Sequence, residues 1–299
     1  MRTIIAVFLS IAVVLLANFD GLYAQSDCRQ QPEFIHQFGF DPTSAAISTS
    51  ERKVMGVALI ELDTKTGARG KTFQHPSWRE AGYMSGVAID EMGDVYVVAA
   101  PAVNVLYNKP EEQNWVYKID HKTGIMSRFM ELPAAAKPTE QNPYGTLGVF
   151  YDCDTRTLFV TSVMGSDQDK ERGRVFAINL KTSQANIVSE NADFMGIGIA
   201  KVAGKRLLML GKCRTSEVYA IELGKDNKPL TPPHVALSLD NLGPRGDDRA
   251  RKIRFINNAL QINAASFYYN LTAPTEKPET VYIFTYSTAQ NNWQLQRYE

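Results

Sequence analysis

The sequence predicts an all-β fold of the β-propeller type, and two observations lead to this prediction. A β-rich run, a turn carrying Asp, Asn, Lys or Gly, and a second β-rich run return five times along the chain. The copies recur at intervals of 43 to 63 residues, and the shortest interval fits a bare four-stranded blade of about 40–50 residues. The five copies lie at 57–67, 115–124, 175–183, 218–226 and 281–289.

Each copy predicts the outer hairpin of a blade, because two runs of similar length flank a polar turn. The inner half of a blade is visible at 85–99, where a strand, a tight turn at Gly93 and a second strand follow one another. A similar pair of runs occupies 147–163. Their β-branched and aromatic residues favour strands over helices. We therefore expect no helix through 115–133, 175–189 or 218–223.

The amino terminus has the pattern of a secretory signal peptide. Arg2 is followed by an apolar run from Ile4 to Ala17, and the small residue Ala24 offers a cleavage site. Asn18 and Asp20 interrupt the run before it reaches the length of a membrane-spanning helix. We expect residues 1–24 to be a leader and residues 25–299 a single propeller domain, secreted or periplasmic, with no membrane insertion after the leader is removed.

Composition narrows the range of partners. The 32 Lys and Arg residues balance the 32 Asp and Glu residues, which argues against nucleic acid as a standing partner. Three cysteines remain in the mature chain, and one pair could form a disulfide in an oxidising compartment. The sequence does not choose the pair among Cys28, Cys153 and Cys213.

A family resemblance enters at 85–98, which reads Ser-Gly-Val-Ala-Ile-Asp-Glu-Met-Gly-Asp-Val-Tyr-Val-Val. This run resembles the inner strands of the TolB-like propellers related to SMP-30/gluconolactonase, strictosidine synthase and NHL-repeat proteins. The resemblance implies six blades, whereas five outer hairpins are visible, so five blades are the alternative. A sixth blade would have to come from residues 28–56 with the carboxy-terminal strands, or from the long final interval.

The resemblance also implies a possible axial metal. Lactonases of this group hold a divalent cation such as Ca²⁺ with carboxylate and amide side chains, including an Asn before the Gly of an inner strand. Here Ser85 precedes Gly86 and Met195 precedes Gly196. Only Asn257 and its neighbour Asn258 keep the expected amide. We therefore expect no tightly bound metal and no other cofactor, and a divalent cation only if the protein is a lactonase.

Propellers commonly bind ligands where the loops before successive inner strands meet at one mouth of the channel. This rule selects a polar and aromatic set with little charge, which favours a small neutral ligand, a sugar or a protein partner over a phosphate. The predicted ligand-binding residues are Tyr83, Ser85, Asn142, Tyr144, Thr146, Asp193, Asn257 and Asn258.

Two functions follow from these observations. The first is a secreted propeller that binds a ligand or protein partner at the channel mouth without catalysis. The alternative is a metal-dependent hydrolase of lactones. A third interpretation, a fold like strictosidine synthase with a channel carboxylate, would use Asp193. The sequence names no catalytic residue and leaves open whether the protein is an enzyme.

Overall fold

The computed structural model describes residues 28–49, 54–63, 65–101, 105–269 and 279–299, and the structural statements below refer to these ranges. The predicted leader, residues 1–24, lies outside them. Strands dominate, and the helices are the short elements α1 (Phe34–Gln37), η1 (Pro76–Arg79) and η2 (Pro110–Glu112). None of the helices in these ranges has the length and apolar character needed to cross a membrane.

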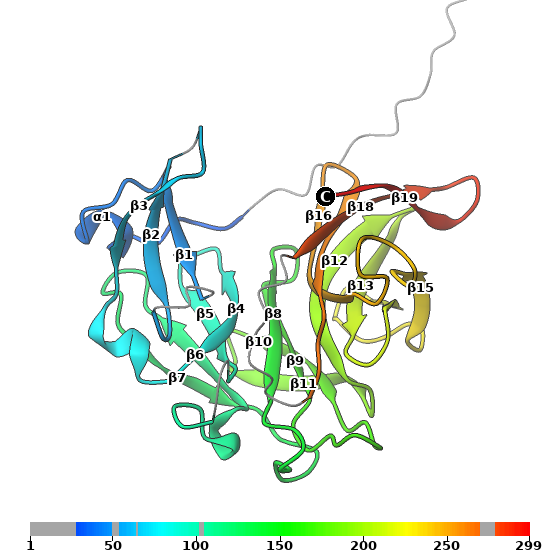
Figure 1. Ribbon diagram of the computed structural model, residues 1–299, viewed down its shortest axis with the longest axis horizontal. Helices are drawn as coiled ribbons and strands as arrows, with labels where there is room; N and C mark the ends of the chain where they lie inside the picture. Colours follow the sequence, from blue (N-terminus) through cyan, green and yellow to red (C-terminus); the bar gives the residue numbers. More distant parts are fainter. Residues whose placement is uncertain (1–27, 50–53, 64, 102–104, 270–278) are drawn as a thin grey trace, which may run out of the picture.

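Nineteen strands form five antiparallel sheets, which follow one another around a common axis (Figure 1). Blade 1 has three strands, β1 (Ala45–Ser48), β2 (Ala58–Leu62) and β3 (Arg69–Phe73). Blade 2 consists of β4 (Met84–Ile89), β5 (Val95–Ala99), β6 (Trp115–Ile119) and β7 (Met126–Glu131). Blade 3 consists of β8 (Thr146–Asp152), β9 (Thr157–Ser162), β10 (Arg174–Asn179) and β11 (Gln184–Glu190).

Blades 4 and 5 complete the ring with four strands each. Blade 4 consists of β12 (Phe194–Val202), β13 (Lys205–Lys212), β14 (Glu217–Glu222) and β15 (His234–Ser238). Blade 5 consists of β16 (Arg249–Ile256), β17 (Ala259–Ala265), β18 (Thr280–Ser287) and β19 (Asn292–Tyr298). The all-β propeller is therefore confirmed, with five blades, the alternative, in place of the six that the family resemblance implied. Residues 28–56 supply α1 and β1, and β1 pairs with β2 of blade 1 instead of starting a separate sheet.

The repeated phrase of the sequence forms the last hairpin of each blade, and its turn chemistry explains the repetition. Asp63 Oδ1 accepts hydrogen bonds from the backbone N–H groups of the residues two and three positions later, at 2.9 and 2.7 Å. Asp120 Oδ1 does the same at 3.1 and 2.8 Å, and Asn179 Oδ1 at 3.0 and 3.1 Å. Short Asp and Asn side chains thus replace backbone partners in these turns.

Apolar residues fill four of the interfaces between neighbouring blades. Separate buried clusters join blade 1 to blade 2, blade 2 to blade 3, blade 3 to blade 4, and blade 4 to blade 5. The described residues form no such cluster between blade 5 and blade 1. In Figure 1 these two blades stand at the two ends of the arc of sheets. Four hydrophobic interfaces therefore join the five blades in series, and the described residues of blades 5 and 1 form no fifth one.

Glycines on the inner strands let neighbouring blades approach closely near the axis. A Cβ added at Gly148 on β8 would lie 2.2 Å from the carbonyl oxygen of Met195 on β12. One added at Gly198 would lie 2.4 Å from the carbonyl oxygen of Ile253 on β16. Because both neighbours are backbone atoms, any larger residue would push two inner strands apart.

A disulfide between Cys28 and Cys153 fastens the amino-terminal segment to the turn between β8 and β9. On its way the segment crosses blade 2, where Gln30 N–H donates to the carbonyl of Asp90 at 3.2 Å and Phe34 N–H donates to the carbonyl of His121 at 3.0 Å. The segment therefore links the lead-in of blade 1 to blade 3. Cys213 is buried and unpaired, so the structure selects one of the pairings that the sequence left open.

Candidate functional site

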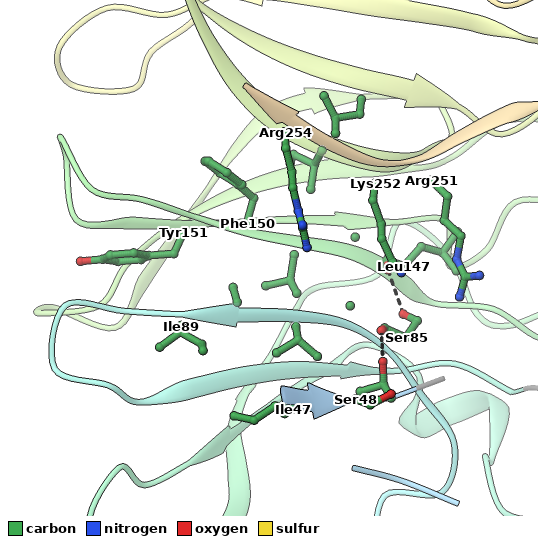
Figure 2. A pocket seen from close by; sticks show the side chains of 18 of the residues that line it. Ile47, Ser48, Ser85, Ile89, Leu147, Phe150, Tyr151, Arg251, Lys252 and Arg254 are labelled. Carbon is green, nitrogen blue, oxygen red and sulfur yellow. Dashed lines mark hydrogen bonds between the residues drawn. The ribbon is translucent and has the colours of Figure 1, made fainter. Parts of the chain in front are cut away.

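A cavity of about 230 Å³ occupies the centre of the ring, and every blade contributes to its wall (Figure 2). β4 supplies five consecutive residues, Ser85 to Ile89, and β8 supplies Leu147 to Tyr151. The end of β1, Ile197 on β12 and a run of β16 complete the lining. Because consecutive residues of two inner strands line it, the cavity extends along these strands like a channel.

Basic side chains give the cavity its charge. Arg29, Arg251, Lys252 and Arg254 line it, and the lining contains no carboxylate among the described residues. Arg251 and Lys252 each approach Glu279, which lies outside the lining, at 3.2 and 3.7 Å. Figure 2 shows Arg254 and Lys252 extending from β16 toward β4 and β8. A ligand in this cavity therefore meets a positive wall on the blade 5 side.

Arg254 differs from its neighbours because its guanidinium group makes no hydrogen bond or ion pair with any residue that the structure describes. Five N–H donors of this guanidinium are thus available to a ligand, in a planar arrangement suited to carboxylate and phosphate oxygens.

The surroundings of Lys252 change the pKa of its ammonium group. Its pKa is lowered from the usual lysine value of 10.5, first because protein atoms around the ammonium group desolvate it. Glu279 opposes this shift, whereas the positive charges of Arg251 and Arg254 reinforce it. The side chain is still 45% exposed, which is consistent with an ammonium group that reaches into the open channel.

Hydroxyl groups lie on the opposite wall. Ser85 Oγ donates to the carbonyl of Leu147 at 2.8 Å, and Thr49 Oγ1 donates to the carbonyl of Ser85 (Figure 2). These bonds tie β1, β4 and β8 together at one end of the cavity. Each hydroxyl oxygen keeps acceptor lone pairs, so this end is polar but uncharged.

Ser85 is the one sequence-predicted residue in the cavity lining. Tyr144 lies with Leu147 in a neighbouring apolar group that also holds Phe267, whose ring centre is 5.3 Å from that of Tyr144. Burial raises the pKa of the Tyr144 hydroxyl to about 12. Tyr83, half-buried just before β4, packs edge-on against Tyr107 at 6.4 Å. Both aromatic residues precede inner strands, as predicted, but they pack on other aromatic rings.

Asn142 and Thr146 are completely buried and support the backbone instead of facing a ligand. The Asn142 side-chain amide donates to the carbonyl of Val163 at 2.8 Å, and its oxygen accepts from Tyr144 N–H at 2.9 Å. Thr146 Oγ1 donates to the carbonyl of Gln113 at 2.9 Å. These bonds fix the start of β8, so both residues position the channel wall without lining it.

Asp193 is also fully buried, and its carboxylate is already satisfied by the protein. It accepts hydrogen bonds from Ser166 Oγ at 2.6 Å, Gly173 N–H at 2.8 Å and Tyr269 Oη at 2.5 Å. Arg214 forms an ion pair with it at 3.3 Å. A carboxylate with this many donors holds β12 and its neighbours together and offers little to a substrate.

Asn257 and Asn258 were expected just before the inner strand of blade 5, but they follow it. They form the exposed turn between β16 and β17, and both have positive φ angles, 50° and 61°. The predicted inner strand follows this pair, but residues 249–256 form the inner strand β16 and residues 259–265 form the second strand. The two amides are therefore turn residues, which tolerate the left-handed conformation well.

Because the inner strand of blade 5 was expected after Asn257 and Asn258, the basic side chains of β16 were not predicted. Residues 244–252 have the charged composition that is typical of an exposed loop, and the sequence did not predict Arg251, Lys252 or Arg254 as channel residues. Alternation was the available signal, since Ile253 is buried between exposed Lys252 and Arg254.

The cavity does not fit an axial divalent cation. Carboxylates and amide oxygens are the usual ligands of Ca²⁺, whereas the described lining offers hydroxyls, carbonyls and four positive side chains. Those positive charges would repel the ion. The donor set thus speaks against the metal-dependent lactonase alternative.

A second group of candidate metal ligands, Asp94, Asp120 and His121, lies at the turns of blade 2. Asp94 contacts Lys118 Nζ at 2.5 Å and His121 Nδ1 at 2.9 Å. Burial alone would raise the pKa of Asp94, but the hydrogen bonds from Lys118 and His121 outweigh it and lower the pKa. Asp120 caps its own turn through Thr123 N–H at 2.8 Å. Protein donors therefore already use these oxygens.

Comparison with protein-family models and with curated proteins gives no match for this sequence. Solved structures show similar folds at low identity. A GH43B protein of a Bacteroides ovatus xyloglucan locus is 13% identical over 76% of this chain, with a TM-score of 0.44, and this chain spans 43% of its length. A protein from Lactobacillus plantarum is 13% identical, covering 85% of this chain and 67% of its own, with a TM-score of 0.49.

A hypothetical selenium-binding protein from Sulfolobus tokodaii is 9% identical to this chain, with a TM-score of 0.48. That match covers 85% of this chain and 63% of the other. Likenesses at this level concern the fold, and one fold serves many functions.

Proposed function

We propose that this protein binds an anionic ligand in the central cavity of its propeller. The observation that supports the proposal is the charge of the lining, with four basic side chains and no carboxylate among the described residues. Like charges placed together in a confined space repel one another, and an anion that neutralises them gains favourable electrostatic energy. Arg254, which has no described protein partner, would be the main contact.

The charge of the cavity changes the expected ligand. Residues before the inner strands suggested a neutral small molecule or a sugar, because that set carries little charge. Arg251, Lys252 and Arg254 favour carboxylate, phosphate or sulfate groups instead. We propose binding without catalysis, since the described lining of the cavity supplies basic and hydroxyl groups but no carboxylate base and no ligand set for a metal.

We further propose that binding takes place outside the cytoplasm. The leader-like residues 1–24 suggest export, and the Cys28–Cys153 disulfide is consistent with an oxidising compartment. Mass spectrometry of exported protein should find Gln25 or a close neighbour as the first residue. Retention of the whole leader on the exported protein would contradict this proposal.

Titration calorimetry with citrate and with glucose tests the proposed charge selectivity. Citrate should bind and glucose should not. Arg254→Gln should weaken citrate binding about tenfold, which corresponds to about 1.4 kcal/mol. Arg297→Gln, which removes a 68% exposed arginine on the outer strand β19, is the matched control and should leave affinity unchanged. Equal binding of glucose, or equal effects of the two substitutions, would refute the proposal.

A further inference from the structure

Among the described residues, blade 1 lacks the innermost strand that the other four blades have. The turn between β2 and β3 matches the turn between β6 and β7, because Asp63 and Asp120 make the same side-chain bonds and are each followed by a glycine with a φ of 68°. Since β6 and β7 are the third and fourth strands of blade 2, β2 and β3 are the third and fourth strands of blade 1. β1 is then a second strand.

The position inside β1 is therefore open among the described residues. β1 pairs antiparallel with β2 on one side and has no paired strand on the other side in the part of the chain described. Ile47 and Ser48 of β1, together with Thr49, line the central cavity. The edge of β1 at Ile47, which has no paired strand among the described residues, thus forms one wall of the proposed anion-binding cavity.

The register of β1 shows which backbone groups lie on this edge. Leu62 N–H donates to the Ser44 carbonyl at 2.8 Å, and Ala46 and Ser48 stand opposite Ile60 and Ala58. Because hydrogen-bonded pairs alternate in antiparallel sheets, Ala46 and Ser48 direct their backbone groups toward β2. Ile47 then directs both its N–H and its C=O away from β2, toward the cavity.

We propose that the ligand is an extended, acidic segment of a partner protein that adds to β1 as the missing inner strand. This proposal rests on the anion binding proposed above and specifies its ligand. Unpaired strand edges are established sites for adding an extended peptide through main-chain hydrogen bonds. The five-residue lining of β4 and of β8 matches a segment of about five residues, at about 3.3 Å per residue.

Side-chain alternation defines the sequence that such a segment needs. One face of blade 1, with Ile47 and Leu59, packs in the apolar cluster shared with blade 2. A strand added to β1 would direct every second side chain toward that apolar side and the others toward Lys252 and Arg254 of blade 5. The segment should therefore alternate apolar and acidic residues.

Synthetic peptides of about five residues, with blocked ends, test this proposal by titration calorimetry on the full protein. A peptide alternating valine and glutamate should bind, and the same peptide with glutamine should bind at least about tenfold more weakly, about 1.4 kcal/mol. N-methylation of every second amide distinguishes the two edges of the bound strand. One methylation pattern should abolish binding and the complementary pattern should leave it intact.

Two variants locate the edge on the protein. Ile47→Pro removes the N–H that faces the cavity and should abolish peptide binding while citrate binding remains. Ile47→Val keeps the N–H and should bind like the natural protein. If Ile47→Pro fails to fold by circular dichroism, the N-methylated peptides give the same answer on the unaltered chain.

The possible outcomes separate the two proposals. Citrate binding without peptide binding, or equal binding of both N-methylated peptides, would refute strand addition and leave anion binding in place. Absence of binding for citrate and peptide alike would refute both. Self-association at high concentration that competes with the peptide would identify a second copy of this chain as the occupant of the edge and would refute a separate partner.

Discussion

Arg251, Lys252 and Arg254 place three positive charges within four positions of β16, and the fold keeps them near one another in the cavity. Glu279 offsets part of this charge through Arg251 and Lys252. What remains is an excess of positive charge where the protein offers no described counterion in the lining. Such an arrangement costs stability without a ligand and is a feature of binding sites more often than of cores.

Lys252 should make ligand binding sensitive to alkaline pH. Its pKa is lowered, so it loses its proton at a lower pH than an ordinary lysine with a value of 10.5. An anion prefers the charged form, so affinity should be constant below this lowered pKa and fall as the pH rises through it. Tyr144 and Tyr151, each with a pKa raised to about 12, stay neutral over this interval.

Calorimetric titration of citrate between neutral pH and pH ~10 measures this effect, since the upper limit lies just below the ordinary lysine pKa of 10.5. Lys252→Arg should remove the alkaline loss of affinity, because arginine stays protonated throughout. A natural protein and a Lys252→Arg variant with the same pH profile would assign the effect to another group.

At the scale of elements, the sequence was sufficient wherever local chemistry decides the structure. The Asp and Asn turns after β2, β6 and β10 recur because side-chain oxygens cap them, and this pattern is readable without a structure. The inner strand β16 was missed because its exposed face is basic. A strand that borders an open channel does not need the apolar residues of a buried strand, so its composition does not distinguish it from a loop.

Blade count and disulfide pairing depend on distant contacts instead. Cys28 and Cys153 are 125 residues apart, and no local pattern connects them. Likewise, a three-stranded blade 1 follows from β1 pairing with β2, which leaves nothing for a sixth sheet among the described residues. Of the predicted mouth residues, Asn142 and Asp193 precede inner strands as expected and Thr146 is the first residue of β8, but all three are buried and support these strands instead of facing the channel.

The Cys28–Cys153 disulfide should contribute strongly to stability, because it closes a long loop and fixes the lead-in of blade 1 to blade 3. Cys28→Ser with Cys153→Ser should lower the free energy of unfolding by about 2–5 kcal/mol. Urea denaturation with and without reductant measures this. Cys213→Ala is the control, since it leaves the disulfide in place and should remain sensitive to reductant. A double variant as stable as the natural oxidised protein would show that the hydrogen bonds of residues 28–34 to blade 2 hold the amino-terminal segment in place without the disulfide.

At the scale of the whole molecule, the ring resembles a chain of blades joined in series. Blades 2, 3 and 4 each share hydrophobic clusters with two neighbours, whereas blades 1 and 5 each share one. Blade 1 also has three strands in the described part of the chain, where the others have four. Regions with fewer buried apolar contacts unfold locally more often. Blades 1 and 5 should therefore unfold before blades 2, 3 and 4.

Hydrogen exchange followed by mass spectrometry should therefore show the fastest exchange in β1, β2 and β3, and the slowest in the strands of blades 3 and 4. Reduction of Cys28–Cys153 should accelerate exchange in blade 1 further, because the lead-in segment is then released from blade 3. A bound acidic peptide should slow exchange in β1, where the Ile47 N–H gains a partner, while citrate should affect β16 without protecting β1. Uniform exchange in all five blades would mean that the ring is closed by forces other than its four apolar interfaces, and it would remove the open edge on which strand addition depends.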